Sequence, residues 1–159
     1  MAHATPASSH RRVGEAILSQ TAVYALRATL CLASHESTRL RVDDIAAGLE
    51  VPRNYLSKIL HVLGHAGVVT SSRGPGGGFQ LSKPAPQIML AEVVERFDQL
   101  PEASGCLLGR PECSDRDPCP AHEQWKDISR SVKEFFLKTS IADLSPGGSP
   151  TARSKRGRP

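Results

Sequence analysis

Aromatic residues are scarce in this chain, in which Phe, Trp and Tyr together account for 4% of the 159 residues. A core made from such a sequence must consist mainly of Leu, Val, Ile and Ala, and the length favours one modest domain with an appendage. Long apolar runs are lacking too, since Gln20 and Arg27 interrupt the most apolar stretch, residues 16–33, and prevent it from spanning a bilayer. Because no apolar run follows the basic residues 10–12, a secretory signal is not expected, and the sequence predicts a cytoplasmic protein.

Cysteine is rare as well, with four residues, but three of them lie close together and a histidine follows the third. The stretch has the spacing C-x6-C-x5-C-x2-H and comprises Cys106, Cys113, Cys119 and His122. In a reducing compartment, such thiols are metal ligands or redox groups more often than disulfides. Thiolates and imidazole suit zinc or an iron–sulfur cluster and do not suit calcium or magnesium. The remaining cysteine, Cys31, lies in an apolar helical pattern and is interpreted as a small buried hydrophobe.

Basic residues outnumber acidic ones, so that the formal net charge is +4. This charge favours an acidic partner such as nucleic acid, although an unselective basic surface would have the same composition. Part of the charge comes from the two ends, where the composition of residues 1–14 and 145–159 predicts disorder. Residues 156–159 read Arg-Gly-Arg-Pro and resemble the core of an AT-hook, which binds the minor groove of A·T-rich DNA. A solvated basic tail is the alternative interpretation.

Two short helices joined by a tight turn are predicted after an amphipathic helix over residues 15–35. Asp43 can cap the first short helix, which ends at Leu49, and Pro52 suits the first turn of the second. This arrangement is typical of a helix-turn-helix, whose second helix enters the major groove of DNA. The polar residues at the start of the second helix are the candidate DNA contacts Arg53, Asn54, Tyr55, Ser57 and Lys58. Alternatively, these residues form an ordinary solvated helix face.

A β-hairpin is predicted next, with strands over residues 67–72 and 79–82 around a glycine-rich turn. A helix-turn-helix followed by a hairpin is a winged helix. Glycines let the backbone of the wing approach the sugar–phosphate surface, and an arginine adds a charge for phosphate. The turn lacks the Gly-Lys-Ser/Thr ending of a nucleotide-binding loop. Its candidate DNA contacts are Arg73, Gly74, Gly76 and Gly77.

A helix over residues 88–100, a cysteine loop over 101–118 and a longer helix from Cys119 or Ala121 complete the prediction. A loop of that length without core residues needs an organiser such as a metal. The apolar side of the long helix exceeds what the small domain can cover, so a helix from a second subunit is expected to pack on it. This stripe consists of Trp125, Ile128, Val132, Phe135, Phe136 and Ile141.

The fold class predicted from these elements is mostly α with a small β-hairpin wing. It consists of a winged helix-turn-helix domain over residues 15–86 and a region over 87–144 that holds the cysteine loop and a dimerisation helix. No pairing of a nucleophile with a base indicates catalysis, so an enzyme is not expected. The remaining histidines of this region, His35, His61 and His65, are interpreted as residues on helix surfaces.

Three segments resemble the Rrf2 family of bacterial winged-helix regulators, which includes IscR-like iron–sulfur and NsrR-like nitric-oxide sensors. They are residues 18–28, Tyr55-Leu56 at the centre of the second short helix, and the turn Arg73-Gly-Pro-Gly-Gly-Gly-Phe. Residues 119–129 are similar to the start of the dimerisation helix of IscR-like members, in which the third cysteine and a histidine three residues later bind a cluster. The resemblance implies a cytoplasmic bacterial homodimer that binds an imperfect palindrome in double-stranded DNA. It also implies a sensor of redox, iron or nitric-oxide status, with a cluster of the 2Fe-2S type held by Cys106, Cys113, Cys119 and His122.

Three departures limit the resemblance. The gap between Cys106 and Cys113 is six residues instead of five, and Ser57 replaces a glutamate of the IscR-like recognition helix. Val23 stands where NsrR-like members have an aspartate, which argues against their 4Fe-4S ligation. Zinc, a cofactor-free regulator controlled by a protein partner or by thiol oxidation, and an iron–sulfur electron-transfer protein are the alternatives.

Overall fold

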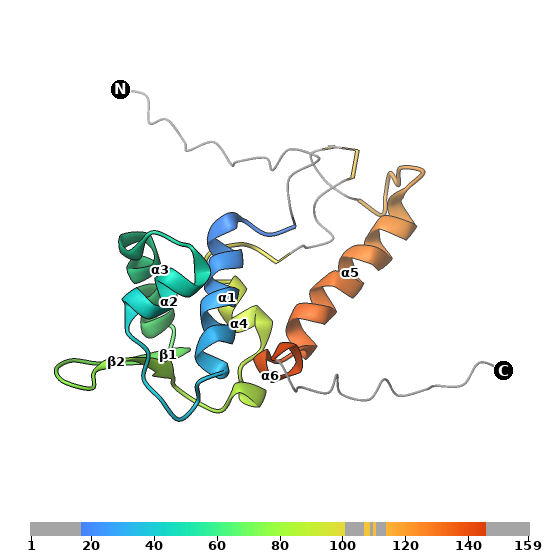
Figure 1. Ribbon diagram of the computed structural model, residues 1–159. Coiled ribbons are helices and arrows are strands. Elements are labelled where there is room, and N and C mark those ends of the chain that lie inside the picture. The colour runs from blue at the N-terminus through green and yellow to red at the C-terminus, as the bar shows by residue number, and fades with distance from the viewer. Residues whose placement is uncertain (1–16, 101–106, 109, 111–113, 146–159) are drawn as a thin grey trace, which may run out of the picture.

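The computed structural model describes residues 17–100, 107–108, 110 and 114–145 of the chain. Its fold is mostly helical with one antiparallel hairpin, so the predicted winged-helix class is confirmed (Figure 1). The two ends that were predicted to be disordered lie outside the described residues, apart from Ser145. Cys106 and Cys113 lie outside them as well. In chain order, the elements are α1 (Gln20–Ala33), α2 (Val42–Leu49), α3 (Arg53–His65), β1 (Val69–Ser72), β2 (Gly78–Leu81), the 3-10 turn η1 (Ala85–Gln87), α4 (Leu90–Val94), α5 (His122–Lys138) and α6 (Ile141–Leu144).

Helix α1 lies at the centre of the domain and packs against α2, α3, α4, α6 and β2. It begins at Gln20, later than the predicted Glu15, because the hydroxyl of Ser19 accepts a hydrogen bond from the backbone N–H of Ala22 and caps the helix. The buried face is built mostly of small residues, which allow close approach of several neighbouring helices. These residues are Ala22, Ala25, Ala28, Thr29 and Leu32.

Helices α2 and α3 form the predicted helix-turn-helix. The prediction that Asp43 caps α2 is wrong, because the helix begins at Val42 with Arg41 at the N-cap position. Asp43 lies in the first turn instead, where its negative charge still suits the positive end of the helix dipole. The turn between the helices places Glu50 in the left-handed region at φ 56°. Pro52 is the N-cap residue of α3 and therefore lies just before its first turn, one position earlier than predicted.

The wing pairs β1 with β2 in antiparallel register, with Val69 opposite Leu81 and Ser72 opposite Gly78. An isolated bridge between Leu40 and Phe79 joins the hairpin to the segment before α2. Gly78 makes this approach possible, since a Cβ at that position would lie 2.5 Å from the carbonyl oxygen of Leu40. Its φ of 154° is also one that side chains other than glycine rarely adopt. The hairpin extends outward from the helical body (Figure 1).

The C-terminal helices differ from the prediction in their boundaries, and α5 begins at His122, after the predicted start at Cys119 or Ala121. Helix α4 covers only Leu90–Val94 of the predicted 88–100 segment. Ile141 was expected to end the apolar stripe of the long helix, but α5 ends at Lys138 and Ile141 begins α6. The reason is a second capping motif: the Ser140 hydroxyl accepts from the backbone N–H of Asp143, while the Asp143 carboxylate accepts from the backbone N–H of Ser140 at 2.8 Å.

Helix α5 projects away from the domain and packs against α4, with its C-terminal end next to α6 (Figure 1). Two backbone hydrogen bonds hold that end: Leu90 N–H donates to the carbonyl of Thr139 at 2.9 Å, and Ile141 N–H donates to that of Ile88 at 2.8 Å. Phe136 and Ile141 are buried in the core there. Among the described residues, no helix combines the length and apolar character needed to cross a membrane.

Candidate DNA interface and candidate metal centre

One side of α3 builds the core, and the other side carries the candidate DNA contacts. Leu56, Ile59, Leu60 and Leu63 are buried. Arg53, Asn54, Tyr55 and Lys58 are exposed, whereas Ser57 is half-buried. The helical period therefore presents the predicted polar residues outward from the first turns of α3. Two of them are already engaged by other helices.

Arg53 is held by Asp43, with its Nε atom 2.5 Å from the carboxylate oxygen Oδ1. The pair joins the first turn of α2 to the first turn of α3. Both side chains are more than half exposed, so the pair stabilises the fold by no more than about 1 kcal/mol. Its structural effect is to orient the guanidinium at the start of the candidate recognition helix. Sequence reasoning assigned Asp43 a capping role and missed this contact.

Tyr55 is held by α1. Its hydroxyl forms a hydrogen bond of 2.5 Å with the hydroxyl of Thr21. Its ring meets that of Tyr24 edge to face, with centroids 6.1 Å apart and an interplanar angle of 82°. Neither Thr21 nor Tyr24 was singled out from the sequence as a partner of α3, because they lie more than thirty residues from Tyr55. The side chain that was expected to contact DNA therefore also sets the position of α3 on α1.

The tip of the wing presents Arg73, Gly74 and Gly76 to solvent, while Gly77 is half-buried. The backbone N–H of Gly77 donates to the carbonyl of Gly74 at 2.9 Å and closes the turn. A Cβ at Gly77 would lie 2.5 Å from the carbonyl oxygen of Ser72, so no larger residue fits there. The turn thus carries one cation on an exposed backbone without bulky side chains.

Of the four candidate metal ligands, the structure places Cys119 and His122. Both are buried, with 8% and 3% of their surface exposed, and the backbone N–H of His122 donates to the carbonyl of Cys119 at 2.9 Å. They lie where the chain enters α5, whose N-cap residue is Ala121. A soft donor and an imidazole are therefore brought together at the foot of this helix and shielded from water.

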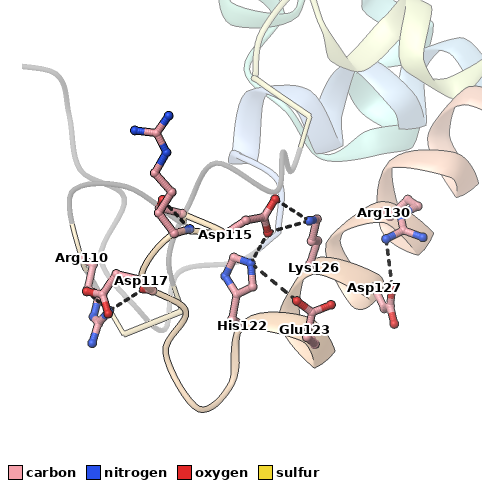
Figure 2. Close-up of polar contacts among 10 residues, drawn as sticks. Arg110, Asp115, Asp117, His122, Glu123, Lys126, Asp127 and Arg130 are labelled. Atoms are coloured by element: carbon pink, nitrogen blue, oxygen red, sulfur yellow. Dashed lines mark hydrogen bonds and ion pairs between the residues drawn. The ribbon is translucent and has the colours of Figure 1, made fainter.

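His122 is also bound by an aspartate that sequence reasoning missed. The imidazole Nε2 lies 2.7 Å from Oδ1 of Asp115, and the carboxylate of Asp115 accepts hydrogen bonds from Nζ of Lys126 at 2.8 and 3.1 Å (Figure 2). Hydrogen bonding from Lys126, and then from His122, lowers the pKa of Asp115. The same contact with Asp115 raises the pKa of Lys126. Asp115 thereby links the cysteine loop to the first turns of α5.

The oxygen atoms around His122 form a second possible donor group. Ligand atoms of Asp115, His122 and Glu123 all lie within 4.8 Å of one another. The ammonium group of Lys126 already neutralises Asp115, however, so this group is a hydrogen-bonded ion cluster and gives no support for a hard cation. The donors that match a soft metal are Cys119 and His122.

Helix α5 carries an apolar groove of about 490 Å³. Ile128 and Phe135 line it and are 54% and 49% exposed, which is unusual for side chains of this size. Trp125, which the sequence placed on the same stripe, is half-buried at the other end of the helix. The remaining lining residues are Ile17, Asp127, Ser131, Val132 and Phe136.

The sequence is similar to those of known transcriptional regulators. The sequence model of the Rrf2 family, described as "Iron-dependent Transcriptional regulator", matches residues 18–147. The HTH-type transcriptional regulator IscR of Photorhabdus laumondii is 34% identical over 122 residues, which cover 76% of this chain and 74% of that protein.

Solved structures share the fold. CymR, described as the global cysteine regulator of B. subtilis, is similar with a TM-score of 0.69 and 23% identity, over 80% of this chain and 95% of that chain. IscR of T. potens is similar with a TM-score of 0.63 and 22% identity, over 80% and 84% of the two chains. The relatives are named as transcriptional regulators, in agreement with the expectation that this chain is not an enzyme.

Proposed function

The chain belongs to the Rrf2 family of transcriptional regulators, and on that premise we propose that it is a homodimeric DNA-binding regulator that senses through an iron–sulfur cluster. The observation that carries the proposal is that Cys119 and His122 are both buried where the chain enters α5. A soft-metal site at one end of this helix and a DNA-reading domain at the other end are the two parts that a sensor needs. IscR, the name of a relative at 34% identity, supports the assignment.

DNA binding is assigned to the exposed side of α3 and to the wing. Asn54 and Lys58 offer an amide and an ammonium group for base edges and phosphates, and Arg73 offers a guanidinium for the flanking backbone. Arg53, Tyr55 and Ser57 complete the candidate surface on α3. Arg53 and Tyr55 would act partly by positioning, since Asp43 and Thr21 hold them. Gly74, Gly76 and Gly77 would let the wing backbone approach the sugar–phosphate surface.

Dimerisation is assigned to α5. Its groove exposes Ile128 and Phe135, and burial of one large apolar side chain stabilises an interface by roughly 1.5–3 kcal/mol. A two-fold axis along this face would bury the same side chains of both subunits in one interface. The two α3 helices would then read the half-sites of an imperfect palindrome, spaced by the helical repeat of DNA.

The cluster is assigned to Cys106, Cys113, Cys119 and His122. Three thiolates and one imidazole suit a 2Fe-2S cluster, which when bound supplies a redox-active group of adjustable stability. In this chain, Cys119 and His122 contribute donors already shielded from water. Asp115 holds the His122 ring by a hydrogen bond and is itself held by Lys126. The contacts around the ligands thus connect the loop to the first two turns of α5.

A route from this site to DNA exists in the packing of the helices. The C-terminal end of α5 is joined to the start of α4 by the hydrogen bond from Leu90 to Thr139. Helix α4 packs against α1, and α1 holds α3 through the bond between Thr21 and Tyr55. A change in the loop that tilts α5 would therefore bias the two α3 helices of a dimer.

The test of the cluster is anaerobic purification followed by iron and acid-labile sulfide analysis and an optical spectrum. We expect a coloured protein with about two irons and two sulfides per chain. Cys119→Ala should lose the colour, whereas Cys31→Ala, a cysteine on α1 outside the loop, should keep it. Colourless wild-type protein with stoichiometric zinc would refute the cluster and favour the zinc alternative, because the same donor set binds zinc.

DNA binding is tested independently with the gel shift of the DNA upstream of the chain's own gene. Loss of binding on Lys58→Ala, with unchanged circular dichroism, is expected. Binding that survives both Lys58→Ala and Asn54→Ala would remove α3 from the contact surface. The gel shift is run on protein with and without the cluster, so the DNA-binding half and the cluster half of the proposal can fail separately.

A further inference from the structure

Two histidines at the end of α3 belong to neither proposed site. His61 and His65 are exposed and lie one helical turn apart, so that both side chains leave the same side of the helix. Their rings lie side by side, with centroids 6.3 Å apart and an interplanar angle of 28°. Paired imidazoles at this spacing on one helical face are the arrangement by which helices bind zinc in metalloproteases.

The spacing of the rings is close to that of a chelate. Zinc binds imidazole nitrogen at about 2.0–2.1 Å with tetrahedral angles, which places the centroids of two ligating rings about 5 Å apart. The observed separation of 6.3 Å requires the rings to approach by roughly 1 Å. Rotation of two exposed side chains provides such a movement without any change in the backbone.

Gly64 leaves room beside the pair. It lies between His61 and His65 in the sequence, carries no side chain and is itself exposed. A Cβ at Gly64 would have as its nearest neighbour the carbonyl oxygen of Val69, at 4.0 Å. A bound ion could therefore keep water molecules in its remaining coordination positions on this side of the helix.

The electrostatic setting favours a cation at this end of α3. His65 lies in the last turn of the helix, where the dipole places partial negative charge. Lys58, the neighbouring cation on the same side, precedes His61 by three residues and is thus one turn farther from the helix end. A divalent ion held by His65 would lie at the favourable end.

We propose that His61 and His65 form a binding site for a divalent transition-metal ion on the outer face of α3. Imidazole selects ions such as Ni²⁺, Cu²⁺ and Zn²⁺, with Cu²⁺ bound most tightly, and does not select Mg²⁺ or Ca²⁺. The site shares no residue with the proposed cluster or with the proposed DNA contacts. The proposal therefore goes beyond the proposed function and can be tested independently of it.

Paramagnetic Ni²⁺ is the probe, because it does not oxidise the thiols of the cysteine loop and it broadens the NMR signals of nearby amides. Substoichiometric Ni²⁺ is added to the full-length protein without a purification tag, and ¹H–¹⁵N spectra are recorded. We expect broadening of the amides of residues 61–67 in the wild type. His61→Gln/His65→Gln should abolish it, while any broadening near the cysteine loop persists in both proteins. Glutamine is a good helix former, so the double variant keeps α3 intact.

Single variants test whether the two rings act together. His61→Gln or His65→Gln alone should weaken Ni²⁺ binding at this site by about 100-fold, because a chelate gains from the proximity of its second ligand. The matched control is His35→Gln, an exposed histidine in the turn after α1 whose Nδ1 lies 2.9 Å from the carbonyl oxygen of Cys31. It should bind Ni²⁺ as the wild type does. Unbroadened residues 61–67 in the wild type, equal broadening in the double variant, or full affinity in a single variant would overturn the proposal.

Discussion

Removal of the Tyr55 hydroxyl should show whether this residue acts on DNA directly or through α1. Its hydrogen bond to Thr21 joins α3 to α1, and the edge-to-face contact with Tyr24 remains in Tyr55→Phe. A neutral hydrogen bond of this kind stabilises a fold by about 0.5–1.5 kcal/mol. We therefore expect Tyr55→Phe to lower the free energy of unfolding by about 1 kcal/mol. Thr21→Val should lower it equally, since it removes the other partner of the same bond.

The assay is urea unfolding at one fixed protein concentration, combined with fluorescence anisotropy on operator DNA. Because both substitutions break one bond, the double variant should be no less stable than either single variant, which gives a coupling energy of about 1 kcal/mol. Their losses in DNA affinity should also match. If Tyr55→Phe weakens DNA binding while Thr21→Val does not, the hydroxyl binds DNA and the positioning role is refuted.

Three further outcomes are expected. Arg73→Ala should weaken binding to all DNA sequences and reduce the slope of log K against log salt by about one, as measured by anisotropy; an unchanged slope would remove the wing from the contact set. Phe135→Ser should shift a homodimer toward monomer in analytical ultracentrifugation by at least about tenfold in Kd, while Leu137→Ser, 46% exposed, should not; equal effects would place the interface elsewhere. The pKa of Glu92 is lowered overall: burial alone would raise it, but hydrogen bonds from Lys83 and from the Met89 N–H have the larger, opposite effect. A lowered pKa contributes stability that is present above the ordinary glutamate pKa and lost as the pH falls through the folded-state pKa. Glu92→Gln should thus lower the free energy of unfolding, measured with urea, by up to about 1 kcal/mol at pH 7 and by much less near pH 3. A loss that is the same at both pH values would contradict this assignment.

Local patterns accounted for the elements, but not always for their ends. The run Arg73–Gly78 predicted the wing because only a tight turn uses so many glycines between two short strands. The start of α1 just after Ser19 and the break between α5 and α6 at Ser140 follow from capping hydrogen bonds. The sequence Ser140-Ile-Ala-Asp143 has the spacing of a capping box, which indicates the start of a new helix. The apolar periodicity instead predicted that the long helix continues to Ile141. The division into the two regions 15–86 and 87–144 stays a prediction.

The contacts that connect the helices could not be read from the sequence. The pairs Arg53 with Asp43 and Tyr55 with Thr21 depend on the angles at which α2 and α1 meet α3, and many side chains in these helices have equivalent chemistry. Nothing in the sequence distinguishes Asp115 from other loop aspartates, and its contacts with His122 and Lys126 arise only in the folded chain. The same holds for the ring pair of His61 and His65, whose spacing was visible but whose exposure was set by the core on the other side of α3.

By itself, the sequence determined the class of fold, the order of its elements and the residue types available for DNA and for a soft metal. These features depend on periodicity, turn chemistry and composition, which are properties of neighbouring residues. Only the tertiary structure decided that Cys119 and His122 are both buried, that Tyr55 is held by α1, and that Ile17 lines the apolar groove of α5. Burial and long-range contacts depend on how whole elements pack, and no short stretch of sequence contains that information.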